Sequence, residues 1–156
     1  MEEILAAIQD GQISQALRFS RWGYATANAL HILGIALLVG AIVPLNLRLL
    51  GLWPRRPLAE VARVLVPMAG VGAVFTVLTG IALFSVRAKR YAEVEFFQAK
   101  LLLIATGITS AIVFHMVSGW WLGRSGPVQR RVHAAISLAC WIGALFCGRY
   151  IAYAGR

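Results

Sequence analysis

The chain has 156 residues, of which 60% are hydrophobic and only 13% are charged, about half the charged fraction of a water-soluble domain. This composition excludes an ordinary soluble enzyme and predicts a single all-α domain made mainly of membrane-spanning helices. The net charge of +9 does not indicate nucleic-acid binding, because the lysines and arginines stand between apolar segments, where they can meet anionic lipid headgroups.

Residues 1–21 precede the first long apolar run and carry apolar side chains at helical spacing. This pattern predicts a short N-terminal amphipathic helix, or two turns broken at Gly11, that lies on the membrane surface. The chain begins with acidic residues, Glu2 and Glu3, whereas a signal peptide begins with basic ones. We therefore expect no cleaved targeting segment.

Four apolar runs follow, and each is long enough to cross a bilayer, which needs about 20 residues. We expect the transmembrane spans at residues 22–45, 64–86, 97–122 and 132–153. Short links join them, so the fold class is an antiparallel bundle of four transmembrane helices with both termini on one side. Basic residues divide almost evenly between the two sides, whereas the acids gather beside the termini. That distribution favours termini on the outer side of the membrane.

Each histidine of the chain falls within an expected span or at its edge. An ionisable side chain there costs a few kcal/mol, so it marks either a functional site or a hydrogen-bonded packing residue. His31 is expected about 13 Å below the terminal face, while His115 and His133 are expected at one depth near the opposite face. Small residues adjoin each histidine on its helix, which is compatible with a haem between helices and equally with tight helix packing.

Imidazole in a helical bundle is a common axial ligand of haem iron. His31, His115 and His133 are therefore candidate ligands of a haem b or, alternatively, of copper. Lys100 and Arg149 are expected near the terminal face, where they can pair with haem propionates or serve only as snorkelling anchors. The methionines stand singly, which is more typical of core packing than of copper binding. The sequence holds no pattern of a stand-alone enzyme, such as carboxylates paired within a span.

Several segments resemble a bacterial family of four-helix membrane proteins of unknown function: LHILGIALLVG at residues 30–40, LRLLG at 47–51 and GRYIAY at 148–153. The segment FQAKLLL at 97–103, followed by Phe114 and His115, is similar to the membrane domain of copper-resistance-D proteins and more distantly to bacterial cytochrome b membrane subunits. The resemblance implies a four-helix bundle in the bacterial inner membrane, with periplasmic termini if the charge distribution is followed. His31, Lys100 and Arg149 stand at positions that match the motifs.

Three functions remain open from the sequence. The first is a membrane cytochrome b that exchanges electrons with a redox partner protein or a quinone. The second is a protein that handles or transports copper or another metal. The third is an accessory subunit without a cofactor, which acts within a larger membrane complex or as a homo-oligomer.

Overall fold

The computed structural model describes residues 2–122 and 124–154, and these residues form helices joined by turns, without a strand. Four helices are long and apolar enough to cross a membrane: α3 (Gly23–Leu50), α4 (Leu58–Val86), α6 (Glu95–Ser118) and α7 (Pro127–Ala154). Two short helices, α1 (Glu2–Gln9) and α2 (Gln12–Phe19), precede them, and α5 (Ala88–Ala92) lies between α4 and α6. The expected all-α four-helix membrane protein is confirmed.

The long helices end where the backbone leaves helical geometry rather than where the apolar runs end. Gly51, with a φ of 113°, terminates α3, and its N–H bonds back to the carbonyl of Arg48. Gly119, with a φ of 78°, terminates α6, so this helix stops before the expected end of its span at residue 122. Glycine adopts this left-handed region without steric cost, which makes both positions natural helix ends.

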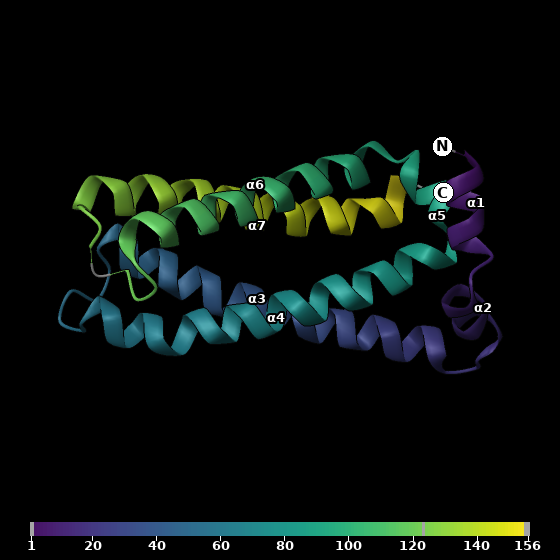
Figure 1. Cartoon of the computed structure of the whole chain (residues 1–156), viewed down its shortest axis with the longest axis horizontal. Coiled ribbons are helices and arrows are strands. Elements are labelled where there is room, and N and C mark those ends of the chain that lie inside the picture. The colour runs from purple at the N-terminus through teal and green to yellow at the C-terminus, as the bar shows by residue number, and fades with distance from the viewer. Residues whose placement is uncertain (1, 123, 155–156) are drawn as a thin grey trace.

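The N-terminal segment forms two amphipathic helices, α1 and α2, rather than a single one. Gly11 separates them and adopts an extended backbone with a ψ of 158°. Both helices lie at the end of the molecule that also holds α5 and the last turns of α4 and α7 (Figure 1). This arrangement gathers the described ends of the chain at one end of the bundle.

The four long helices form two antiparallel hairpins, α3 with α4 and α6 with α7, which are joined where α3 packs against α7 (Figure 1). In the described part of the chain, the backbones of α4 and α6 stay further apart than those of the other neighbouring long helices. Their side chains still meet, because Phe84 of α4 stacks on Phe97 of α6 with ring centroids 5.1 Å apart. Only 6% of the most apolar stretch of α4 is buried inside the protein, so most of this stretch lies at the outer surface of the bundle.

Two features pack the bundle: a close glycine contact between α3 and α4, and a buried apolar core near one end. Glycines bring α3 and α4 close together, because a Cβ added at Gly72 would lie 2.8 Å from Leu38 Cα and 3.0 Å from Gly34 O. The buried apolar core lies toward the end opposite the termini, where it includes Leu45, Leu49, Leu58, Ala62, Phe114, Leu122 and Ala134. This half of the molecule is therefore the more firmly packed one.

Candidate functional site

The imidazole of His115, near the end of α6, is the most unusual polar group of the bundle. Its Nδ1 lies 2.8 Å from the backbone carbonyl oxygen of Ala111, one turn earlier. Because a carbonyl only accepts, Nδ1 carries a hydrogen, and in the neutral ring Nε2 then presents a lone pair. Nε2 is buried and has no hydrogen-bond partner among the described residues. A buried acceptor without a partner costs free energy, which a metal ion or a donor ligand would recover.

His133 lies beside His115, on the neighbouring helix α7. Its Nδ1 is 3.0 Å from Ser110 Oγ, and its ring stacks on Phe114 with a centroid distance of 4.0 Å. The His115 ring also faces Phe114, with a centroid distance of 6.5 Å. Both imidazoles therefore lie around Phe114, at one level of the α6–α7 hairpin in the half opposite the termini.

The local helix geometry explains how α6 builds this cluster. Ser110, Phe114 and Ser118 recur every four residues, so they form one stripe of α6, and Phe114 and Ser118 in this stripe are buried. His115 stands one position beyond Phe114, at the border of this stripe. Its ring and the ring of Trp120 pack edge to face, with their centroids 5.6 Å apart. The hydroxyl of Ser118 is also buried and has no hydrogen-bond partner among the described residues.

His31 lies in the other half of the bundle and connects α3 to α4. Its Nδ1 is 3.0 Å from Thr79 Oγ1, and that hydroxyl donates to the carbonyl of Phe75 on its own helix. The imidazole therefore acts as the donor in the bond to Thr79, and it also interacts with the backbone of Thr76. The ring lies against Gly80, whose missing side chain leaves room for it: an added Cβ would be 3.2 Å from His31 Cε1.

The structure separates His31 from the other two histidines. Asn46, further along α3, donates to Ser137 Oγ on α7 at 2.9 Å, and Ser137 is one turn from His133. His31 precedes Asn46 by about 22 Å along the helix axis. One ion or one haem iron cannot bind His31 together with the histidine pair on α6 and α7.

Lys100 and Arg149 both lie in the half that contains His31. Lys100 Nζ would be 3.6 Å from a Cβ added at Gly148, and its charge acts on His31. Arg149 is exposed, donates to Tyr153 Oη at 3.2 Å and packs over that ring. Lys100 precedes His115 by about 22 Å along α6, so these two cations do not belong to the same site as His115.

The polar partners of the histidines were not identified from the sequence. Ser110 and Thr79 are single hydroxyl residues within apolar runs, where such residues are common. Asn46 was the clearest sequence signal of a polar contact between helices, because an amide in an apolar run requires a partner. In the structure this side chain is 2% exposed and bonds to Ser137 rather than to a histidine.

Other metal-ligand groups do not join the histidine pair. Among the described residues, no group of three or more His, Cys, Asp or Glu side chains is placed to hold one metal ion. The two cysteines, Cys140 and Cys147, are free thiols on α7. Met116 follows His115 but is 79% exposed, which places it on the outer surface of the bundle.

Comparison of the chain with protein-family models, with curated proteins and with solved structures finds no match. The resemblance noted in the sequence therefore stays a prediction, and the candidate site depends on its own geometry.

Proposed function

We propose that this protein is a b-type membrane cytochrome, in which His115 would bind the iron of a haem in the half of the bundle opposite the termini. The observation that carries the proposal is the buried Nε2 of His115, which has no partner among the described residues. The bond from Nδ1 to Ala111 fixes the ring and leaves Nε2 as the ligating atom. Histidines that bind metals almost always donate their other ring N–H to an oxygen in this way.

The small number of neighbouring ligands favours haem over copper. A haem brings four nitrogen donors of its own and requires only one or two protein ligands. Protein copper sites commonly use three or more side chains, and among the described residues no three His, Cys, Asp or Glu side chains are placed to hold one ion. His133 is the second-ligand candidate, because it stands beside His115 and Ser110 already holds its Nδ1.

The surroundings of His115 can serve the other needs of a haem. The exposed cations Arg124 and Arg131 lie at the same end of the bundle as His115 and can pair with propionates at the membrane edge. Phe114 stacks on the His133 ring and Trp120 packs against the His115 ring, and His115 Nε2 is buried.

A bound haem supplies one-electron chemistry, so the function is electron transfer to or from a redox protein or a quinone in the bilayer. We further propose a location in the bacterial inner membrane with periplasmic termini, on the basis of the family resemblance and the distribution of acids. Copper handling and a cofactor-free accessory role are the competing functions, and the experiment below distinguishes them.

The test is an optical spectrum of the full chain purified from haem-replete membranes. We expect a reduced-minus-oxidised Soret difference in the native protein, its loss in His115→Gly, and its recovery when free imidazole is added to that variant. Met116→Ala changes the adjacent, exposed residue and serves as the matched control. His31→Ala should keep the Soret difference, because His31 bonds to Thr79 in the other half of the bundle.

Three outcomes would overturn the proposal. A colourless native protein that carries copper without iron would favour metal handling. A colourless, metal-free protein that co-purifies with a larger complex would favour the accessory role. A Soret difference that persists unchanged in His115→Gly would show that another residue binds the haem.

A further inference from the structure

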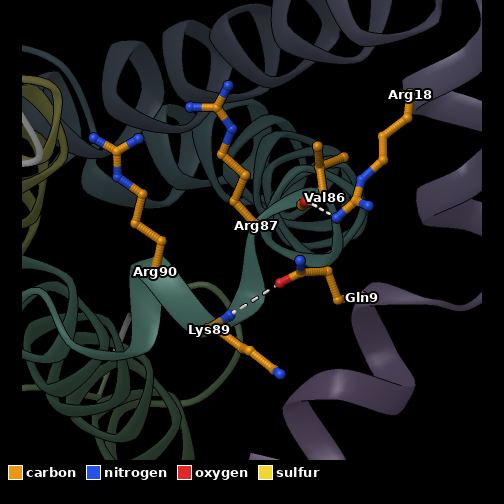
Figure 2. Close-up of a pocket in the computed structure, with 6 residues that line it drawn as sticks. All are labelled: Gln9, Arg18, Val86, Arg87, Lys89 and Arg90. Carbon is orange, nitrogen blue, oxygen red and sulfur yellow. Dashed lines mark hydrogen bonds between the residues drawn. The ribbon is translucent and has the colours of Figure 1, made fainter.

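A cavity of about 380 Å³ lies where the two amphipathic helices meet the turn between α4 and α5. Its lining is predominantly basic and comprises Gln9, Arg18, Val86, Arg87, Lys89 and Arg90 (Figure 2). These residues come from α1, α2, the end of α4, and α5 with the residue before it, so the N-terminal helices and the α4–α5 region are far apart in the sequence. The cavity therefore exists only when the N-terminal helices are folded onto the end of the bundle.

Two hydrogen bonds hold the walls of this cavity in place. Arg18 Nη2 donates to the carbonyl oxygen of Val86, the last residue of α4. The backbone N–H of Lys89 donates to Gln9 Oε1 at 3.4 Å. The first bond attaches α2 to the end of α4, and the second attaches α1 to α5.

The backbone turn between the helices directs the remaining arginines. Arg87 leaves helical geometry, with φ −141° and ψ 47°, and this break separates α4 from α5. Arg90 follows three residues later, and both side chains extend in the same direction, with the Arg18 guanidinium on the other side of Val86 (Figure 2). Lys89 points away from this pair.

The positive charge of the cavity has no counterion among the residues that the structure describes. No carboxylate among residues 2–122 and 124–154 lies within salt-bridge distance of the four basic side chains, and Arg87 and Arg90 donate no side-chain hydrogen bond to those residues. The like charges of these side chains repel one another, and an anion bound between them would be attracted to each of them. Guanidinium groups match the oxygen geometry of phosphate and can bind it with two parallel hydrogen bonds.

We propose that this cavity binds a phosphate group, with Arg87 and Arg90 as its ligands and Arg18 closing the opposite wall. The cavity stands at the end of the four apolar helices and beside two amphipathic ones (Figure 1), which is the level of lipid headgroups. An anionic phospholipid and free inorganic phosphate both carry the required group. This inference is independent of the haem proposal, since no histidine contributes to the cavity.

The test measures lipid binding to the full chain in neutral detergent by native mass spectrometry. Phosphatidylglycerol should bind, and zwitterionic phosphatidylcholine should bind much more weakly. The double variant Arg87→Gln/Arg90→Gln should bind phosphatidylglycerol about 25-fold more weakly, roughly fivefold for each arginine. The control, Arg55→Gln/Arg63→Gln, removes the same charge from exposed residues at the other end of the bundle and should bind normally.

A competition with millimolar inorganic phosphate distinguishes the two sources. Displacement of phosphatidylglycerol supports the site with free phosphate as its ligand, and lack of displacement supports it with the lipid. The proposal is overturned if neither probe binds, if both lipids bind equally, or if the control loses as much affinity as the double variant. Equal thermal unfolding midpoints for the two double variants would ensure that a difference in binding is not a difference in folding.

Discussion

The close contact between α3 and α4 gives the sharpest stability prediction. The substitution Gly72→Ala places a methyl group 2.8 Å from Leu38 Cα and 3.0 Å from Gly34 O. Both are backbone atoms of α3, so neither can rotate away as a side chain does. Optimal carbon contacts are about 3.5–4.0 Å, and the two helices must therefore separate by about 1 Å.

This separation is expected to cost about 2 kcal/mol of the free energy of unfolding. Overpacking of a close interface costs about 1–3 kcal/mol, and the better helix propensity of alanine returns less than about 1 kcal/mol. Separation of the helices also lengthens the 3.0 Å bond between His31 and Thr79, an interhelical bond worth about 0.6 kcal/mol. A net loss near 2 kcal/mol corresponds to about a 30-fold change in the unfolding equilibrium.

The assay is reversible unfolding of the purified chain by titration of SDS into a mild detergent. Gly70→Ala is the matched control, because it lies on the same helix and an added Cβ has nothing within 4 Å. We expect this control to unfold like the native protein or slightly later. If Gly72→Ala is as stable as Gly70→Ala, the reasoning is refuted and the two helices do not approach each other at this position.

Three further predictions concern other parts of the molecule. Asn46→Ala should lower the free energy of unfolding by about 1–2 kcal/mol, because the Ser137 hydroxyl loses its buried 2.9 Å partner. A double-mutant cycle with Ser137→Ala should give a coupling near 0.6 kcal/mol, and zero coupling would contradict the bond. Arg18→Gln should release α2 from the carbonyl of Val86 and speed hydrogen exchange in α2, whereas unchanged exchange would show that this bond does not hold the helix. Burial, followed by a neighbouring tyrosine, raises the pKa of Tyr91 above its usual 10.0. The folded protein therefore retains this proton longer than the unfolded chain, so thermal stability should fall above about pH 10; a Tyr91→Phe variant should lack that fall.

The number and order of the spans were predictable, because each long apolar run must satisfy its backbone hydrogen bonds internally in a bilayer and therefore forms a helix. The ends of the helices were less predictable. The sequence between Ser118 and Leu122 remains apolar, and hydropathy alone extends the third span through it. The structure ends α6 at Ser118 because Gly119 adopts a positive φ, a backbone property that apolar composition does not reveal.

For the candidate site, the sequence predicted depth but not contact. Counting residues along the helices placed His115 and His133 at one level and His31 at another. In the structure, the rings of His115 and His133 both lie around Phe114, whereas His31 bonds to Thr79 on α4. The partners depend on how each helix is rotated about its axis, and one residue changes the direction of a side chain by about 100°. Ser110 on α6 could therefore not be paired with His133 on α7 before the helices were placed.

Hydrogen bonds between the long helices follow a simple rule that singles out His115. In the described part of the chain, each packed interface contains one side-chain hydrogen bond: His31 with Thr79 between α3 and α4, Asn46 with Ser137 between α3 and α7, and Ser110 with His133 between α6 and α7. Helices in lipid gain little from burying apolar surface against one another, so such polar pairs help to select partners and register. Two of the histidines thus have a structural role in helix association. His115 has none, because its Nδ1 bonds within α6 and its Nε2 bonds to no described residue. Bonding between helices therefore does not account for this half-buried imidazole, whose Nε2 is buried without a partner among the described residues, as are the hydroxyls of Thr76 and Ser118.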